Sequence, residues 1–154
     1  KMTPLERVKD FLEKQETRLE VIEFPEGATQ TCELAAQALG VEPAQIAKSL
    51  LFVGKKMNIL VVTCGDEKVD QKKLKEHFGD KFRFARAEEV LEITGFPPGG
   101  VCPFALKTPI PIVIDKSIGR FPVVYAAAGN AGSAVPVNLE QLLEITKGKL
   151  LSVC

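Results

Sequence analysis

Two apolar segments separated by a tight turn restrict most strongly what this chain can fold into. Residues 50–53 and 58–63 are short, almost uninterrupted apolar runs, and Gly54, Lys55 and Lys56 stand between them. Runs of this length bounded by a turn are typical of strands that are buried in a sheet. The sequence therefore predicts a β-hairpin whose two strands belong to the core.

Helix signals surround this hairpin on both sides. Thr3 and Glu6 form a capping box with proline at the first helical position, and Gly148 is expected to end the last helix. The spacing of apolar residues predicts helices over about residues 4–16, 32–39, 43–47, 71–78, 87–93 and 139–147. Further strands are expected over residues 19–24, 82–84, 110–115 and 121–126.

Two loops rich in small residues interrupt this pattern. Residues 94–111 carry several prolines and glycines and cannot form a regular helix, and residues 127–134 are almost all alanine and glycine. There is no repeat, linker or low-complexity segment. We therefore expect one domain over residues 1–154, of the α+β class, with a mixed and largely antiparallel sheet.

The charge balance excludes one class of function. The 154 residues include 20 basic and 20 acidic side chains, so the net charge is zero. A protein that covers long stretches of nucleic acid backbone needs a surplus of basic residues. The balance leaves room for the recognition of one small end of a nucleic acid.

The cysteines and the apolar runs indicate in which cellular compartment the protein is expected. No run approaches the roughly 18 apolar residues of a membrane span, and the first residues lack the apolar core of a signal peptide. Cys32, Cys64, Cys102 and Cys154 are far apart, and only His77 is available to join them in a metal site. We expect a cytoplasmic protein with reduced cysteines, without a metal, a cofactor or a membrane partner.

Common catalytic motifs are missing from this sequence. It has no GxSxG, HExxH, P-loop or GxGxxG pattern, and His77 lies in a charged segment that is typical of a solvated helix face. A cysteine nucleophile needs a histidine partner or a helix N-terminus. Cys102, in its proline-flanked loop, is the one cysteine that suggests direct chemistry.

Three features remain as candidate site elements. Lys48 stands beside an apolar strand, where a lysine is either an edge residue or a cation at the mouth of a pocket. The loop at residues 99–103 has two glycines that allow close backbone approach and expose N–H donors, as an oxyanion or a phosphate requires. A second loop with Gly129, Asn130 and Gly132 is of the same kind, and both loops are alternatively simple turns.

These features occur in an order that resembles a known family. The segments TCELAAQALGVEPAQIAKSLLF, TGFPPGGVCPFAL and VVYAAAGNAG, the last followed by a strand and the NLEQLLEI helix, are similar to the YbaK/ProX family. Its members are free-standing relatives of the editing domain inserted in bacterial prolyl-tRNA synthetases. Lys48 matches the family's functional lysine, and residues 99–103 match its G-x-x-x-P loop. The resemblance covers nearly the whole chain and implies the editing-domain fold, a mixed sheet or partial barrel surrounded by helices.

The resemblance implies a trans-acting aminoacyl-tRNA deacylase. Such an enzyme hydrolyses the ester of a mischarged tRNA, usually tRNA(Pro) carrying a small amino acid such as Cys or Ala, and its partners are the aminoacylated acceptor end and prolyl-tRNA synthetase. The substrate's own thiol or ribose hydroxyl takes part, which explains a missing protein base. The expected catalytic residues are Lys48, Gly100, Val101 and Cys102. The expected substrate-binding residues are Thr31, Ile46, Ser49, Gly99, Pro103, Gly129, Asn130 and Gly132.

Two other classes of function stay open at this point. The second loop has Ala127, Ala128 and Asn130 where many relatives have more glycine and a basic residue. That difference favours a non-catalytic module that binds a tRNA end and recruits or regulates a synthetase. A redox protein that uses Cys102 is the third class.

The charge balance generates a first prediction. Because recognition of an acylated 3′ end needs only one or a few cations, affinity for uncharged tRNA should be modest and should fall only gently with salt. Binding measured over a series of salt concentrations tests this. A salt slope that corresponds to many phosphate contacts would contradict it.

Overall fold

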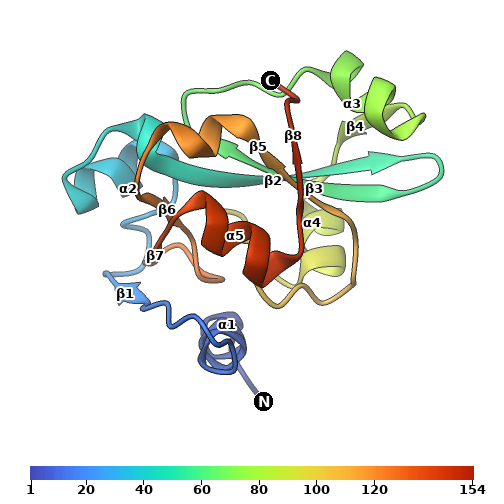
Figure 1. Ribbon diagram of the computed structural model, residues 1–154. Helices are drawn as coiled ribbons and strands as arrows, with labels where there is room; N and C mark the ends of the chain where they lie inside the picture. The colour runs from blue at the N-terminus through green and yellow to red at the C-terminus, as the bar shows by residue number, and fades with distance from the viewer.

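An eight-stranded mixed sheet is the centre of the computed structural model, which describes residues 1–154 (Figure 1). The strand order is β1-β7-β6-β2-β3-β5-β8, and β4 pairs with β2. The pairs β2–β6, β3–β5 and β5–β8 are parallel, and the other four are antiparallel. The strands are β1 (Ile22–Glu23), β2 (Ile46–Gly54), β3 (Asn58–Cys64), β4 (Phe82–Phe84), β5 (Ile112–Asp115), β6 (Val124–Ala126), β7 (Ser133–Val137) and β8 (Lys149–Leu151).

The expected hairpin is confirmed as the pair β2–β3. Its register runs from Ala47 opposite Cys64 to Val53 opposite Asn58. Successive residues of β3 are buried on opposite faces, in two separate apolar clusters. This two-sided burial explains why the strand reads as a continuous apolar run rather than an alternating one.

Helices cover both faces of the sheet. Helices α1 and α5 pack on one face against a large cluster that includes Phe96 and Phe104, whereas α3 packs on the other face around Phe52. Figure 1 shows α3 above the β2–β3 hairpin and α4 below it. The helices are α1 (Pro4–Glu13), α2 (Cys32–Leu39), α3 (Gln71–Phe78), α4 (Ala87–Thr94) and α5 (Leu139–Thr146), with 3-10 turns η1 (Pro43–Gln45) and η2 (Lys116–Arg120). None of the helices has both the length and the apolar character needed to span a bilayer.

Side-chain caps begin most of these helices as the sequence predicts. The hydroxyl of Thr3 accepts the Glu6 amide, and the Glu6 carboxylate accepts the Thr3 amide in return. Asn138 and Gln141 form the same reciprocal box at α5, and Thr31 and Asp70 each accept one amide of the first turn of α2 and α3. Each cap satisfies amides that the first turn of a helix leaves without partners.

Several expected boundaries are wrong. The first helix ends at Glu13, the helix expected over 43–47 is only the 3-10 turn η1, and the strand expected over 19–24 is reduced to two exposed residues. Leu19 and Val21 instead pack against the core from a segment without ladder partners. Strand β8 has no counterpart among the expected strands.

The end of the last helix also differs from expectation. Lys147, with φ of 55°, takes the left-handed conformation expected of Gly148. A Cβ at Gly148 would lie 2.9 Å from the Thr146 hydroxyl, 3.0 Å from the Ile114 side chain and 3.2 Å from the Ile112 carbonyl of β5. The glycine is therefore required for close packing against β5 rather than for the turn.

One carboxylate organises the turn of the central hairpin. Asp80 accepts the main-chain amides of Lys55 (3.2 Å), Lys56 (2.8 Å) and Met57 (3.3 Å), and it is 5% exposed. The Lys56 amide is the largest of the influences that hold the Asp80 pKa below its ordinary value. The contribution to stability is therefore complete above the unfolded pKa of about 3.9, and it is lost as the pH falls through the lower folded pKa.

We predict that Asp80→Ala lowers the melting temperature at pH 7 by several degrees, because three turn amides lose their acceptor. Thermal unfolding of both proteins between pH 7 and pH 2 measures the effect. The difference between them should shrink at the acidic end. A difference that does not change with pH would show that the carboxylate charge is not what holds the turn.

Candidate active site

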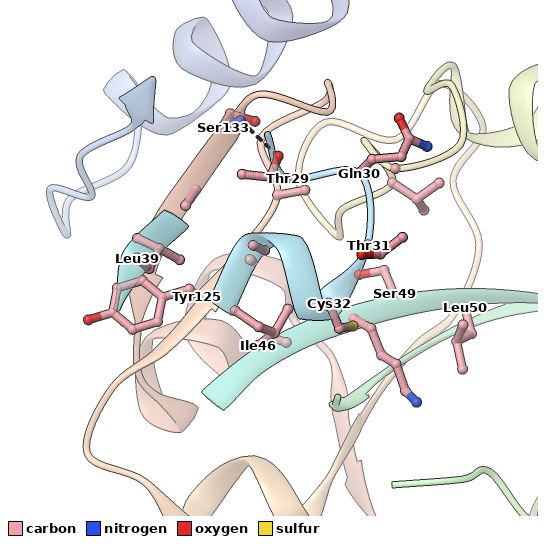
Figure 2. Close-up of a pocket in the computed structure, with 18 residues that line it drawn as sticks. Thr29, Gln30, Thr31, Cys32, Leu39, Ile46, Ser49, Leu50, Tyr125 and Ser133 are labelled. Atoms are coloured by element: carbon pink, nitrogen blue, oxygen red, sulfur yellow. Dashed lines mark hydrogen bonds between the residues drawn. The ribbon is translucent and has the colours of Figure 1, made fainter. Parts of the chain in front are cut away.

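A cavity of about 290 Å³ lies at a gap in the pairing of β2 (Figure 2). On one edge, β2 pairs with β6 over Ile46–Ala47 and with β4 over Phe52–Gly54. Residues 46–50 of this strand form one side of the cavity, and the start of α2 forms another. The cavity therefore sits beside the stretch of main chain that lies between the two partner strands.

The lining of the cavity is mostly apolar and carries one charge. Of the 18 lining residues, 11 are hydrophobic, and the only charged one is Lys48. Five of them are alanines, namely Ala35, Ala47, Ala126, Ala127 and Ala134. Small side chains leave space for a small group to enter, and no carboxylate or imidazole of the protein is present to act as a general base.

The ammonium of Lys48 is held by main-chain carbonyls. Its Nζ donates to the carbonyl of Glu67 (2.6 Å) and, over a longer distance, to that of Gly65 (3.4 Å). Both carbonyls belong to the segment that joins β3 to α3. An ammonium has three donors, so one donor of Lys48 remains for a ligand.

Ser49, the next residue along β2, contributes an unpaired hydroxyl to the cavity. Its Oγ is buried and has no hydrogen-bond partner. The Leu51 carbonyl accepts the Ala85 amide at the open edge of β2, and because main-chain groups alternate along an antiparallel strand, those of Ser49 face this edge as well. In Figure 2, the hydroxyl ends of Ser49 and Thr31 point into the same part of the cavity. The Thr31 hydroxyl also accepts the Leu34 amide as the cap of α2.

The first glycine loop reaches the cavity with two residues. Gly99 and Val101 line it, whereas Gly100, Cys102 and Pro103 do not. The Gly100 amide donates to Pro97 (3.0 Å), and the Val101 amide donates no hydrogen bond within the protein. The Gly99 amide donates none either, so the free donors of this loop at the cavity are the amides of Gly99 and Val101.

The second loop lines the cavity with its ends, Ala127, Ser133 and Ala134, whereas its glycines support the first loop. Gly129, Asn130 and Gly132 lie outside the lining. A Cβ on Gly100 would come within 2.6 Å of the backbone of Gly129 and Asn130, so the two loops touch through their main chains. Asn130 accepts the Gly132 amide (3.0 Å), which fixes the turn.

Cys102 belongs to the core. Its side chain is fully buried in the cluster with Phe96 and Phe104, and its Sγ donates to the Phe104 carbonyl (3.6 Å). Burial raises the pKa of the Cys102 thiol to about 12. The thiol is therefore neutral at physiological pH and closed off from solvent, which argues against nucleophilic or redox chemistry at this residue.

Several lining residues were not predicted from the sequence. Among them, Gln30 covers Gly99 and donates to the Pro98 carbonyl (3.3 Å), and Thr29 accepts the Ser133 amide, as Figure 2 shows. Burial raises the pKa of the Cys32 thiol, and the nearby Lys48 charge opposes this rise. Cys32 had a sequence signal because it directly follows the predicted cap Thr31, and Ala127, Ser133 and Ala134 belong to the small-residue loop predicted over 127–134.

A cluster of possible metal ligands lies outside the cavity. Ligand atoms of Glu67, Asp115 and Cys154 are within 4.8 Å of one another. The two Asp115 oxygens accept the amides of Val153 (2.8 Å) and Ser117 (2.9 Å). These bonds attach the final residues to the end of β5, and they account for the position of Asp115.

The sequence matches the aminoacyl-tRNA editing domain family over residues 26–145. The chain therefore belongs to this family. It is 42% identical over 137 residues to the uncharacterized protein YwhH of Bacillus subtilis (strain 168). The aligned residues cover 88% of this chain and 87% of that protein.

Further relatives are synthetases and a free-standing protein. A proline–tRNA ligase of Thermotoga neapolitana is 39% identical over 107 residues, which cover 69% of this chain and only 18% of the ligase. The protein EbsC of Enterococcus faecalis, named as a candidate Cys-tRNA(Pro)/Cys-tRNA(Cys) deacylase, is 26% identical over 80% of this chain and 76% of its own. A crystal structure of a candidate trans-editing enzyme for prolyl-tRNA synthetase has a TM-score of 0.91 and 36% identity over 99% of this chain and 98% of that one.

The unpaired hydroxyl generates a stability prediction. We expect Ser49→Ala to leave the free energy of unfolding unchanged or to raise it by up to about 1 kcal/mol, because a buried hydroxyl without a partner is removed. Chemical denaturation measures the change. Ser133→Ala is the matched control, since that hydroxyl accepts the Ala128 amide (2.9 Å) and donates to the Asn130 carbonyl (3.2 Å).

The control substitution should cost about 1–3 kcal/mol. A loss of similar size in Ser49→Ala would show that Ser49 does have a partner in the folded protein.

Proposed function

We propose that this chain is a trans-acting aminoacyl-tRNA deacylase. It hydrolyses the ester that joins a small non-cognate amino acid, Cys or Ala, to the 3′ end of tRNA(Pro). The observation that carries the proposal is the position of Lys48 as the single charge at a cavity otherwise lined by neutral and mainly apolar residues. We assign the activity to residues 1–154 acting as one editing domain in the cytoplasm.

In this proposal, the cavity selects its substrate by the size of the amino acid side chain. The acyl side chain enters between the alanines, and the ester and the terminal nucleotide stay at the mouth near Lys48. One methylene changes binding by only about 1–3 kcal/mol, so a second site that excludes the cognate amino acid adds selectivity that one site does not reach. Thr31, Ile46 and Gly99 line this sieve.

The proposed chemistry needs few protein groups. Water attacks the ester carbonyl, the carbonyl oxygen becomes an oxyanion, and collapse of the intermediate releases the amino acid and the ribose hydroxyl. The Val101 amide and the remaining donor of Lys48 stabilise the oxyanion. Because no lining residue is a carboxylate or a histidine, a group of the substrate itself, its thiol or a ribose hydroxyl, relays a proton from the attacking water to the departing ribose oxygen.

The relatives support the same substrate class. EbsC is named for deacylation of Cys-tRNA, and the trans-editing structure is named for prolyl-tRNA synthetase. The ligase relative carries the similar segment within a longer protein. On this basis the acceptor end of tRNA is the partner, and prolyl-tRNA synthetase is a second partner.

We predict that the purified protein releases amino acid from mischarged tRNA and that Lys48→Ala lowers kcat/KM by about 100-fold, as expected for the loss of one oxyanion donor. Release of alanine, cysteine and serine from charged tRNA is the measurement. Lys55→Ala, an exposed lysine in the turn of the same hairpin, is the control and should keep full activity.

Two results would contradict the proposal. One is that no acyl-tRNA is hydrolysed faster than in buffer. The other is tight tRNA binding that survives Lys48→Ala without turnover, which identifies a non-catalytic module that binds the tRNA end.

A further inference from the structure

A bidentate ion pair involves the residue that stands between the two carbonyls that hold Lys48. Arg120, the last residue of η2, donates to Asp66 through Nη2 (2.6 Å to Oδ1) and Nη1 (3.2 Å to Oδ2). Asp66 stands between Gly65 and Glu67, the two residues whose carbonyls accept the Lys48 ammonium. The pair therefore joins the segment after β5 to the three-residue segment that fixes this ammonium.

Main-chain hydrogen bonds hold the two neighbours of Asp66, whereas Asp66 itself is held through its side chain. The Gly65 amide donates to the Ile46 carbonyl (2.8 Å) and the Glu67 amide to the Cys64 carbonyl (3.0 Å). On the other side, the Arg120 guanidinium also donates to the Ser117 carbonyl (3.3 Å) and lies over the Phe121 ring (5.2 Å to the centroid). The Asp66 carboxylate thus binds an anchored guanidinium from a position between the two residues whose carbonyls hold Lys48.

We propose that the Asp66–Arg120 pair positions the Lys48 ammonium for deacylation, by orienting the Gly65 and Glu67 carbonyls. The inference rests on the proposed function of Lys48. Two donors of the ammonium are fixed by these carbonyls, so the direction of the third, toward the substrate oxygen, is set by the same segment. Arg120 and Asp66 do not line the cavity, and they act through Lys48.

The solvent exposure of Asp66 and Arg120 indicates that their ion pair positions Lys48 and contributes little to the stability of the fold. Both side chains are 42% exposed. Pairs with this exposure contribute little to the free energy of unfolding. Arg120 also holds the Asp66 pKa below its ordinary value, so the carboxylate is charged whenever Lys48 is needed at neutral pH. The effect of breaking the pair is therefore expected in catalysis, where a small displacement of a positioned group is costly.

Steady-state deacylation of the three charged tRNAs tests the positioning role. We expect Asp66→Asn and Arg120→Ala to lower kcat by about 10-fold, with little change in KM and a melting temperature within about 2 °C of the wild type. The matched control is Arg83→Ala, which breaks a pair of the same bidentate geometry with Glu89 (2.8 and 3.0 Å) away from the cavity. The control should keep its kcat.

Coupling to Lys48 separates positioning from a general structural effect. In a Lys48→Ala background, Arg120→Ala should lower kcat no further, because the group that it orients is gone. The charge-swapped double variant, Asp66→Arg with Arg120→Asp, should recover part of the lost kcat. An unchanged kcat in both single variants, or an undiminished effect in the Lys48→Ala background, would overturn the inference.

A second measurement is independent of activity. The rate at which an amine-acetylating reagent modifies Lys48, followed by mass spectrometry, reports how firmly its ammonium is held, and Lys55 is the internal reference. We expect Asp66→Asn to raise Lys48 acetylation several-fold relative to Lys55. Equal rates in the two proteins would overturn the positioning role, whereas absence of deacylation by the wild type would overturn the proposed function alone.

Discussion

The pairing of β2 is the interaction on which the rest of the structure depends. One edge of this strand is fully occupied by β3, and the other is divided between β6 at its start and β4 at its end. Because the two partner strands do not meet, the middle of β2 borders a cavity instead of a third strand. The site therefore lies where the main chain of β2 has no partner strand on this edge.

The alternation of side chains along β2 gives the cavity its two kinds of polar group. Lys48 shares a face with Leu50 and Phe52, on the side covered by α3, and its ammonium reaches the segment that leads into that helix. Ser49 shares the opposite face with Ala47 and remains without a partner. Two successive residues thus supply an anchored cation and an unsatisfied hydroxyl. Their side chains point to opposite faces of the sheet, and both line the cavity because it lies at the edge of β2.

Local signals in the sequence predicted the parts of the fold that local chemistry determines. The hairpin, the caps at Thr3 and Thr31 and the loop at residues 99–103 follow from patterns within a few residues. The contribution of the second glycine loop did not follow, because the contact of Gly100 with Gly129 depends on how two distant segments pack. Strand β8 was missed because its pairing with β5, rather than its own pattern, makes it a strand.

The same distinction applies to the candidate site. Lys48 stood out because it lies beside an apolar strand and matches the functional lysine of the family that the sequence resembles, whereas its surroundings did not follow from the sequence. The Asp66–Arg120 pair joins residues 54 positions apart, and each alone reads as an ordinary surface charge. A freely moving ammonium is hydrogen-bonded equally well by water. In a chain with no net charge, a lysine therefore binds one substrate atom selectively only when neighbouring groups fix its position. Two main-chain carbonyls, oriented by the ion pair of the residue between them, turn one lysine among many into a directed donor.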